Sequence, residues 1–416
     1  MKTLDAWLRF IEQQHPKTIA LGLERVAAVF SRMNIQIAAP AITVAGTNGK
    51  GSTCAMLESI LREAGYRTGL YTSPHLLRYN ERVRVAGAEA DERALGEAFE
   101  AVERARGAVP LTYFEYGTLA AFYVFVKQKI EVAVLEVGLG GRLDAVNIVD
   151  ADCAVLTSVG IDHVDYLGPT REDIGREKAG IFRAGRPAVI ADPDPPRSVV
   201  EATGAKLFLG KDFGYETQGA QWSYWGPAGR RAGLAHPALR GKTQLRNAAA
   251  ALCALDSVRE RLPVAMQDVR RGLASVELPG RFQVLAGRPQ VILDVAHNAE
   301  AAAALARNLA DSGFAPETFA VCGMLRDKDI AAVVRALAPR VTRWHVAPLP
   351  GPRGAGADEI ASHLGGAAVE KFASPAAAFA AARERAGESD KIVVFGSFLT
   401  VGDVIAWLNN NKTSIR

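Results

Sequence analysis

The sequence predicts an α/β protein with two domains, the larger built on a doubly wound, mostly parallel sheet. Short apolar runs recur along the chain with helical segments between them, which is typical of strands buried on both faces of a parallel sheet. A glycine-rich turn at residues 46–53 joins one such run to a helix, as in phosphate-binding loops. A chain of 416 residues exceeds one ordinary hydrophobic core, so a second domain is expected.

The elements of the first half follow from the periodicity of the apolar residues. Residues 1–16 include Asp5 and Glu12, so they predict an amphipathic helix rather than a secretory signal. Strands are expected at 41–44, 68–71, 130–137, 153–157 and 188–190, and helices at 21–34, 54–65, 91–107 and 114–127. The Asp- and Pro-rich residues 192–196 predict a turn or loop.

The second half changes character after residue 205. Aromatic and polar residues alternate up to residue 235, which predicts short antiparallel strands appended to the main sheet. A helix is expected at 243–262, followed by a domain junction at 279–282. Further strands are expected at 291–293, 319–322, 343–346 and 392–395, with alanine-rich helices between them. The predicted domains are residues 1–283 and a smaller, Rossmann-like α/β domain at residues 284–416.

Composition narrows the classes of function. The formal charge is only +4 and the basic residues are scattered, so a nucleic-acid partner is not expected. The four cysteines are far apart with no C-x-x-C pair, which predicts neither a zinc site nor disulfides and fits a reducing cytoplasm. No run of 18 uncharged apolar residues exists, so no membrane span is expected. These properties favour a soluble globular enzyme.

The glycine-rich turn consists of Gly46, Thr47, Asn48, Gly49, Lys50, Gly51, Ser52 and Thr53. Its backbone N–H groups and the following helix N-terminus can point at phosphate, and Lys50 adds positive charge. Ser52 or Thr53 offers a hydroxyl to Mg²⁺. The spacing departs from the usual G-x-x-x-x-G-K-[ST], because fewer residues separate the glycines and Gly51 follows Lys50. The turn predicts a P-loop that binds a nucleoside triphosphate, and the alternative is a strand-to-helix turn with an exposed lysine.

Other polar groups follow predicted strands of the first domain. Glu136 ends its strand and can hold Mg²⁺ opposite the phosphates, or else be a solvent-exposed glutamate. Asp162 and His163 follow another strand, where the histidine is either a structural hydrogen-bonding group or a metal ligand. Lys178 by itself is best interpreted as a surface lysine paired with a neighbouring glutamate. The glycines at 138–141 do not fit a dinucleotide fingerprint, because their spacing is wrong.

The second domain has two comparable strand ends. Asp294, His297 and Asn298 follow one strand, at the edge where α/β sheets place ligands. Asn298 is alternatively a helix N-cap. Residues 396–398, Gly-Ser-Phe, follow the last strong strand.

Seven motifs combine into a pattern: G-T-N-G-K-G-S at 46–52, T-S-P-H at 72–75, E-V-G-L-G-G-R-L-D at 136–144, D-H at 162–163, E-K-A-G-I at 177–181, P-G-R-F at 279–282 and D-V-A-H-N at 294–298. In this order they resemble the folylpolyglutamate synthase branch of the Mur ligase family. L-T-Y-F-E-Y-G-T at 111–118 and G-M-L-R-D-K-D-I at 323–330 are similar in particular to its bifunctional bacterial members, which are dihydrofolate synthase and folylpolyglutamate synthase in one chain. The resemblance extends from about residue 21 to the C-terminus.

The resemblance implies an ATP-dependent amide ligase. The substrate's carboxylate attacks the γ-phosphate of ATP to give an acyl phosphate, and the amine of L-glutamate then displaces phosphate. The implied substrates are dihydropteroate, reduced folates and L-glutamate. The implied cofactors are ATP, Mg²⁺ at two sites, K⁺ and a carbamate carried on Lys178. A cytoplasmic monomer without nucleic-acid or membrane partners is expected.

The resemblance also implies roles for single residues. Those at the phosphates and metals are Lys50 and the loop backbone for phosphate, Ser52 for Mg²⁺, and Ser73, Glu136 and His163 for a second Mg²⁺. The implied nucleotide contacts are Asn247 at the adenine, Arg281 and Asp294. The implied substrate contacts are Phe114 and Asp144 at dihydropteroate, and His297 and Ser397 near the incoming glutamate. The catalytic residues are then expected to be Lys50, Glu136, His163 and Lys178.

Three alternatives remain open at this level. Another Mur-type ligase would join amino acids to a cell-wall nucleotide, although the 111–118 motif argues against it. A GTPase-like switch would use the same loop but needs an N-K-x-D guanine reader, and the nearest string, R-D-K-D at 326–329, lacks the asparagine. A nucleotide-gated binding module would be distinguished by whether ATP turnover depends on both a carboxylate and an amine.

Overall fold

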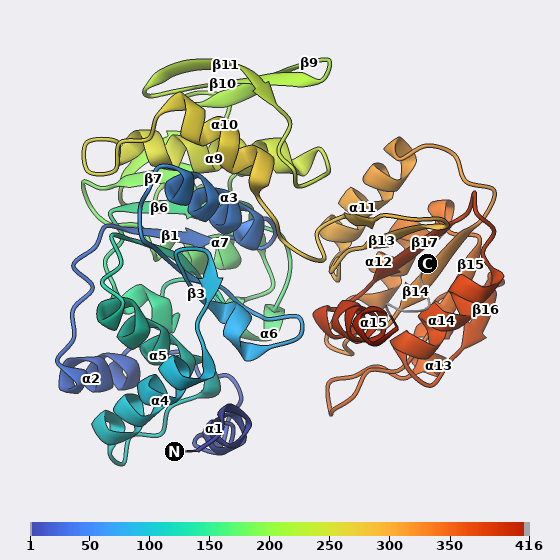
Figure 1. Cartoon of the computed structure of the whole chain (residues 1–416), viewed down its shortest axis with the longest axis horizontal. Coiled ribbons are helices and arrows are strands. Elements are labelled where there is room, and N and C mark those ends of the chain that lie inside the picture. The colour runs from blue at the N-terminus through green and yellow to red at the C-terminus, as the bar shows by residue number, and fades with distance from the viewer. Residues whose placement is uncertain (1, 412–416) are drawn as a thin grey trace. The chain divides into compact units, whose positions relative to one another are not determined.

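The computed structural model describes residues 2–411 and divides the chain into two compact units (Figure 1). The first unit holds the chain up to residue 238 together with residues 244–276, and the second holds residues 239–243 and the chain from residue 277 onward. Each unit has its own sheet and hydrophobic core, which confirms the predicted α/β fold class. No helix among the described residues is long and apolar enough to cross a membrane.

Eight strands form the main sheet of the first unit: β1 (Ala41–Ala45), β2 (Thr68–Tyr71), β3 (Val83–Val85), β4 (Ala88–Glu89), β5 (Val132–Glu136), β6 (Cys153–Leu156), β7 (Pro187–Ile190) and β8 (Ala205–Phe208). Their order is β4-β3-β2-β5-β1-β6-β7-β8. Pairing is parallel from β2 to β8, and β3 and β4 add an antiparallel edge. Strand order reverses at β1, and ligands of doubly wound sheets bind at the carboxyl end of such a strand.

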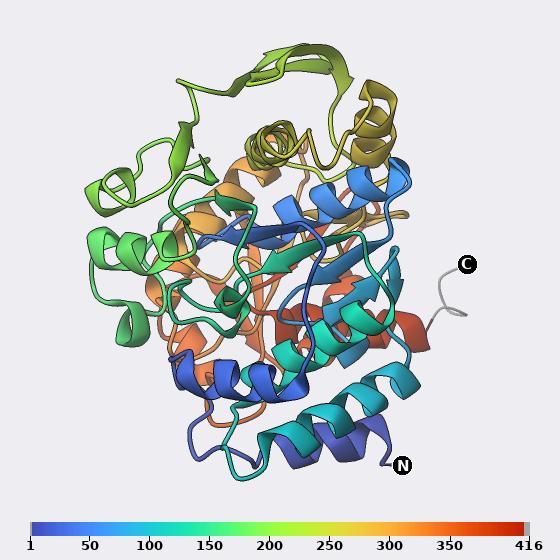
Figure 2. The same ribbon diagram turned by 90° about the vertical axis from the view of Figure 1, so that its left-hand side faces the viewer.

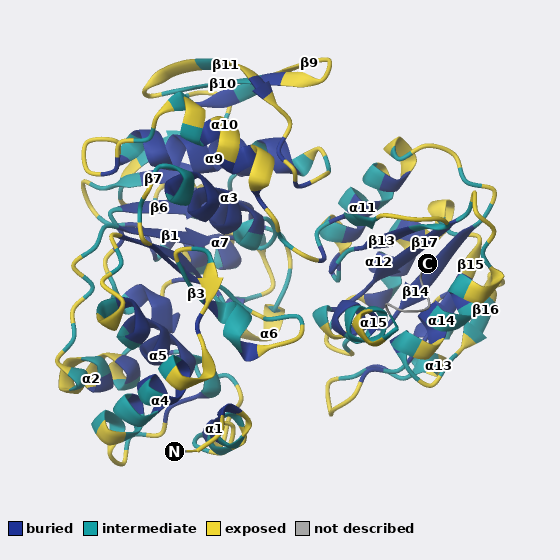
Figure 3. Cartoon of the chain, in the orientation of Figure 1, coloured by how far each residue is buried: buried dark blue, intermediate teal, exposed yellow. Residues whose placement is uncertain are grey.

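Helices cover this sheet and bury its apolar strands, as the dark blue strands in Figure 3 show. They are α1 (Leu4–Ile11), α2 (Glu24–Met33), α3 (Lys50–Glu63), α4 (Glu92–Arg106), α5 (Tyr113–Lys127), α6 (Val164–Leu167), α7 (Arg171–Ala179), α8 (Arg197–Val200), α9 (Thr243–Ser257) and α10 (Met266–Ser275). Residues of α1, α2, α4 and α5 share one core with β1, β2 and β5, and Figure 2 shows α4 and α5 side by side. The amphipathic helix expected at the N-terminus is present as α1, which buries Leu4, Trp7 and Ile11.

Helices α3 and α9 have bounds that differ from the predicted ones. Helix α3 begins at Lys50 rather than residue 54, because Gly49 adopts a left-handed conformation with φ of 90° and serves as its N-cap. Its first turn therefore lies inside the glycine-rich motif. Helix α9 ends at Ser257, five residues before the predicted end at 262.

The segment at 205–235 differs from the prediction. Strand β8 pairs in parallel with β7, so it extends the main sheet. Strands β9 (Gly214–Gln218), β10 (Gln221–Gly226) and β11 (Gly229–Ala235) form a separate antiparallel sheet instead of adding to the main one. This small sheet is attached to α9 through Asp256, whose fully buried carboxylate accepts a 2.7 Å hydrogen bond from the Tyr224 hydroxyl and pairs with Arg231 at 2.7 Å.

The second unit has a six-stranded sheet made of β12 (Gln283–Leu285), β13 (Gln290–Leu293), β14 (Thr318–Cys322), β15 (Arg343–Val346), β16 (Ala368–Lys371) and β17 (Lys391–Phe395). The order is β12-β13-β17-β14-β15-β16, parallel except for β12. Its helices are α11 (Ala299–Asp311), α12 (Ile330–Leu337), α13 (Ala357–Ala361), α14 (Pro375–Arg385) and α15 (Phe398–Asn410). The four predicted strands are confirmed, and the two unexpected ones, β12 and β16, are the sheet's edges.

The four cysteines are all buried and unpaired: Cys54, Cys153, Cys253 and Cys322. Burial raises the pKa of each thiol above its usual value. The expected absence of disulfides among them is confirmed, and the raised pKa values keep the thiols protonated and unreactive.

Candidate active site

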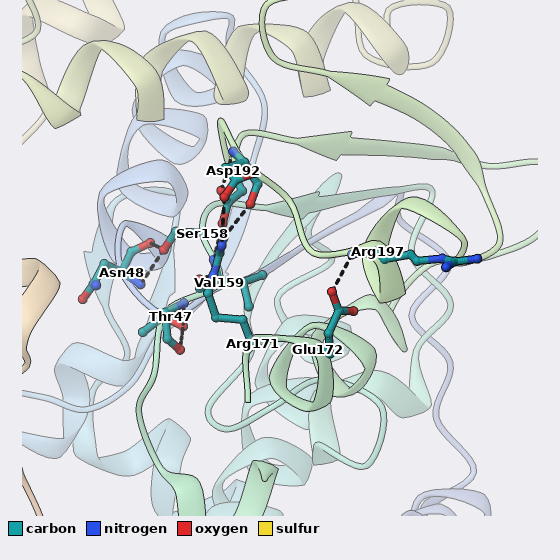
Figure 4. A network of polar contacts seen from close by, with 10 residues as sticks. Thr47, Asn48, Ser158, Val159, Arg171, Glu172, Asp192 and Arg197 are labelled. Carbon is teal, nitrogen blue, oxygen red and sulfur yellow. Dashed lines mark hydrogen bonds and ion pairs between the residues drawn. The ribbon is translucent and has the colours of Figure 1, made fainter. Parts of the chain in front are cut away.

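The phosphate loop connects β1 to α3, and its glycines are required by close contacts. A Cβ atom on Gly46 would lie 1.9 Å from Thr157 Oγ1, and one on Gly49 would lie 2.6 Å from Asn247 Oδ1. Gly49 provides no side-chain cap for α3, so the backbone of the first helical turn is available to an anion. Thr47 and Asn48 form hydrogen bonds with residues 158–160, which follow β6 (Figure 4).

Lys50 curls back over the loop. Its Nζ donates hydrogen bonds to the carbonyls of Gly46 at 2.9 Å and Thr47 at 3.4 Å. Of the two hydroxyl candidates for Mg²⁺, Thr53 donates to the Gly49 carbonyl at 3.0 Å inside the helix. This bond makes the buried Ser52 the better metal-ligand candidate.

The carboxyl ends of β5 and β2 bring Glu136 and Ser73 together. Glu136 is the last residue of β5 and only 5% exposed, so the interpretation as a solvent-exposed glutamate is wrong. Its Oε2 accepts a 3.1 Å hydrogen bond from the Ser73 backbone. Glu136 and Lys50 both act electrostatically on Cys54, the former raising and the latter lowering the pKa of its thiol. The carboxylate and the ammonium group therefore lie near the same turn of α3.

His163 precedes α6 in a left-handed conformation, with φ of 54°. Its backbone N–H donates to Asp162 Oδ1 at 2.9 Å, and its Nε2 lies 4.0 Å from the same oxygen. The structure thus places the imidazole beside a carboxylate.

Lys178 lies near the C-terminal end of α7 and is only 4% exposed. The surface-lysine interpretation is therefore wrong: its neighbour Glu177 pairs with Arg142 at 2.8 Å instead. Burial first, and then the positive charge of Lys50, lower the pKa of Lys178 to about 7, while Asp162 and Asp144 act in the opposite direction. A substantial fraction of this amine is neutral at physiological pH.

The two expected dihydropteroate contacts are Asp144, in the turn at residues 138–144, and Phe114, on α5. Asp144 is buried and accepts hydrogen bonds from the backbone of Leu139 at 2.8 Å and Val146 at 3.0 Å. Burial raises the pKa of its carboxyl to about 6 despite these bonds. Phe114 lies against the same turn, because a Cβ on Gly138 would be 2.5 Å from its ring.

Asn247 projects from α9 toward the phosphate loop, beside Gly49. Its Nδ2 donates a 3.0 Å hydrogen bond to Gln244 Oε1 one turn earlier, and both side chains are buried. The Asn247 side chain, which is an expected adenine contact, therefore lies next to the phosphate loop.

The remaining candidates gather within the second unit, where β13 and β17 pair in parallel. Asp294 accepts 2.8 Å hydrogen bonds from the backbones of Phe282 and Ala296, and burial raises its pKa. The Arg281 guanidinium lies 4.9 Å from the ring centroid of Phe398, and the His297 ring lies 6.4 Å from it.

Two of the candidate residues of the second unit are helix N-caps. Ser397 is the N-cap of α15 and accepts from the Leu399 backbone at 3.2 Å. Asn298 is the N-cap of α11, as its alternative interpretation predicted. Sequence reasoning missed Phe398 as a contact of Arg281 and His297. Its only signal was its position after a strand-end Gly-Ser.

Both units match models of known protein families. The profile of the Mur ligase middle domain matches residues 44–255, and that of the Mur ligase glutamate ligase domain matches residues 280–398. A dihydrofolate synthase/folylpolyglutamate synthase of Escherichia coli is 47% identical over 99% of this chain and 96% of its own length.

Two solved structures are similar over nearly their whole length. One is E. coli FolC in complex with DHPP and ADP, with a TM-score of 0.95 and 46% identity, covering 99% of both chains. The other is a bifunctional folylpolyglutamate synthase/dihydrofolate synthase with Mn, AMPPNP and L-glutamate bound, with a TM-score of 0.92 and 45% identity over 98% of both chains. The chain therefore belongs to the dihydrofolate synthase/folylpolyglutamate synthase branch of the Mur ligase family.

Proposed function

We propose that this chain is an ATP-dependent ligase that adds L-glutamate to dihydropteroate and to reduced folates. One observation carries the proposal: Glu136 ends β5 opposite Val44 of β1, the strand that leads into the phosphate loop, and the turn that follows β5 packs on the end of α7 that carries the buried Lys178. Homology to enzymes of this activity over the full chain supports it.

The chemistry requires activation of a carboxylate, because a free carboxylate is a poor electrophile. The substrate's carboxylate oxygen attacks the γ-phosphorus of ATP, the bond to ADP breaks, and an acyl phosphate forms. The amine of L-glutamate then attacks the acyl carbon, phosphate leaves, and the ammonium proton is released. The loop N–H groups and Lys50 bind and orient the phosphates, which is the main source of catalysis in phosphoryl transfer.

The buried Ser52 and Glu136, with Ser73 bonded to Glu136, offer oxygen atoms of the kind that Mg²⁺ prefers. No three His, Cys, Asp or Glu side chains converge anywhere in residues 2–411, so phosphate oxygens and water would complete the coordination of an ion here. We assign Ser52 to one ion and Ser73, Glu136 and His163 to a second. Mg²⁺, when bound, neutralises negative charge on the phosphate oxygens.

Lys178 is proposed to carry a carbamate. The ammonium group would first lose one proton, and the neutral amine would then attack CO₂, forming an N–C bond and releasing a second proton, so that a buried cation becomes an anion. The lowered pKa of about 7 and the nearby charge of Lys50 both favour this product. Phe114 and Asp144 are assigned to the dihydropteroate site.

Residues of the second unit are assigned to the other ligands. Arg281 and Asp294 are proposed nucleotide contacts, and His297 and Ser397 are proposed to lie near the incoming glutamate. Asn247 of the first unit is the proposed adenine contact. K⁺ as a cofactor, the monomeric state, the cytoplasmic location and the domain boundary at residue 283 stay predictions.

The test is to incubate the purified protein with Mg-ATP and L-glutamate, with dihydropteroate in one reaction and a reduced folate in another. Mass spectrometry is expected to find one added glutamate in both products. No addition to either substrate would overturn the ligase assignment, and addition to the folate alone would overturn bifunctionality.

The nucleotide-switch alternative has no support from residues 326–329. Asp329 is the N-cap of α12, and Asp327 forms an ion pair with Arg353 at 2.7 Å. Both carboxylates thus have structural partners within the second unit. The cell-wall ligase alternative would instead predict that ATP turnover and amino-acid addition require a cell-wall nucleotide and not a folate.

A further inference from the structure

The segment after β6 is bonded closely to the phosphate loop. The Thr47 backbone donates to the Ser158 carbonyl at 2.9 Å, and the Asn48 backbone donates to Ser158 Oγ at 3.0 Å. Thr47 Oγ1 donates to the Gly160 carbonyl at 3.1 Å and accepts from its N–H at 2.9 Å. Any movement of residues 157–160 would therefore move the loop that binds phosphate.

Both backbone groups of Val159, in the middle of this segment, are held by charged side chains (Figure 4). Its N–H donates to Asp192 Oδ2 at 2.6 Å, and its carbonyl accepts from Arg171 Nε at 2.8 Å. Arg171 also lies 3.5 Å from the Asp192 carboxylate, which is only 6% exposed. Asp192 follows β7, the strand that pairs in parallel with β6, so its carboxylate is placed to reach the segment that follows β6.

The same pair reaches two other parts of the proposed site. Arg171 is the first residue of α7, and Lys178 lies about two helical turns further along that helix. Asp162 and His163 follow Gly160 in the chain, with only Ile161 between. Fixing Val159 and Arg171 thus fixes the loop, the approach to His163 and the start of the helix that carries Lys178.

We propose that Asp192 and Arg171 are positioning residues that hold the phosphate loop and α7 in register for nucleotide binding. The assignment rests on the proposed ligase function. The pair acts through the backbone of Val159. A buried charge-assisted hydrogen bond stabilises one geometry strongly, because loss of one partner leaves the other unsatisfied.

The test compares Asp192→Asn and Arg171→Ala with matched controls. Asp194→Asn is the control for the carboxylate, because Asp194 also pairs with Arg171, at 3.0 Å, but its side chain is 90% exposed. Arg176→Ala is the control for the helix, because Arg176 also lies on α7 but pairs with the partly exposed Asp173, at 3.3 Å. Each variant is assayed for thermal unfolding, for the Kd of Mg-ADP and for the KM of ATP and of L-glutamate.

Asp192→Asn and Arg171→Ala are each expected to raise the Kd of Mg-ADP and the KM of ATP about tenfold, with the KM of L-glutamate nearly unchanged. The Kd of Mg-ADP and the KM of ATP of the double variant should be about those of the more impaired single variant, because both residues act on one peptide unit. The controls should match the wild type.

Two results would overturn the proposal: folded variants with wild-type nucleotide constants, or equal changes in the constants for ATP and glutamate. If Asp192→Asn does not fold, Arg171→Lys provides the same comparison, since lysine keeps the charge but not the Nε–H bond to Val159. A wild-type protein that binds Mg-ADP but adds no glutamate would instead refute the ligase function while leaving this test intact.

Discussion

At the scale of single residues, Lys178 is buried, and burial lowers the pKa of its amine to about 7. Lys178→Ala is expected to lower ligase turnover about a hundredfold or more while the Kd of Mg-ADP stays nearly constant, since the lost group acts on the reaction rather than on the nucleotide. Lys211→Ala, at an exposed position, is the control. Unchanged turnover would remove the role assigned to Lys178.

The carbamate on Lys178 predicts a dependence on CO₂ and pH. CO₂ reacts with the neutral amine, and the neutral fraction grows as pH rises through about 7. Turnover in CO₂-depleted buffer should therefore fall most at pH below 7 and recover on addition of bicarbonate. Acetate or formate should restore part of the activity of Lys178→Ala. Equal turnover with and without CO₂ at every pH would contradict the carbamate.

Asp144 predicts a pH-dependent stability. Its pKa is raised from 3.8 to about 6, so the folded protein binds this proton more tightly than the unfolded chain does. Its contribution is fully present below pH 3.8 and is lost as pH rises through about 6, a change of about 3 kcal/mol at 1.36 kcal/mol per pKa unit. The difference in unfolding free energy between wild type and Asp144→Asn should fall over this range. Asp150→Asn, whose side chain is 67% exposed, should show no such trend.

At the scale of elements, Asp256 connects the small antiparallel sheet to α9. Asp256→Ala should reduce the free energy of unfolding by about 2–3 kcal/mol, because the Arg231 guanidinium, on a side chain that is 20% exposed, loses its buried partner. Tyr224→Phe removes one neutral donor and should cost about 1 kcal/mol. Urea denaturation measures both. Glu216→Ala on β9, which breaks an exposed pair with Arg230, should change stability little, and an equal loss there would refute the special role of Asp256.

The elements that the sequence predicted well are those with apolar patterns of their own. The buried strands β1, β5 and β17 are continuous apolar runs, so their burial follows from composition. Helix α7 lacks such a pattern: R-E-D-I-G-R-E-K-A is mostly charged, although it buries Lys178. That burial depends on the distant turn at 138–144, which packs on the end of α7, and no local pattern encodes it.

Some residues of the candidate site were likewise predictable from the sequence, and others were not. Polar residues at strand ends, such as Glu136 and Asp294, were predictable because parallel strands end at one edge. The contact between Asp192 and Val159 was not, since a turn with three prolines and two aspartates gives no sign of which carboxylate turns inward. The separate sheet at 214–235 was missed because an alternating pattern does not specify which sheet a strand joins.

At the scale of the whole molecule, each unit has the core that independent folding needs. The second unit contains a six-stranded sheet and a cluster of fully buried residues including Ile292, Val333 and Phe395. A fragment of residues 277–411, about 135 residues and within the usual domain size, should therefore unfold cooperatively by circular dichroism. It should not bind Mg-ADP tightly, because the phosphate loop is in the other unit. A broad, non-cooperative transition would contradict independent folding.

The four buried cysteines make this protein a convenient background for spectroscopic labelling. Native thiols that stay protonated and enclosed compete poorly for maleimide dyes, so one cysteine introduced at exposed Arg93 and another at Phe314, which is 92% exposed, would take nearly all the label. These positions lie in different units. Energy transfer between a donor and an acceptor placed there would report the distance between the two halves in solution, and its response to nucleotide and glutamate, without removing any native residue of the core.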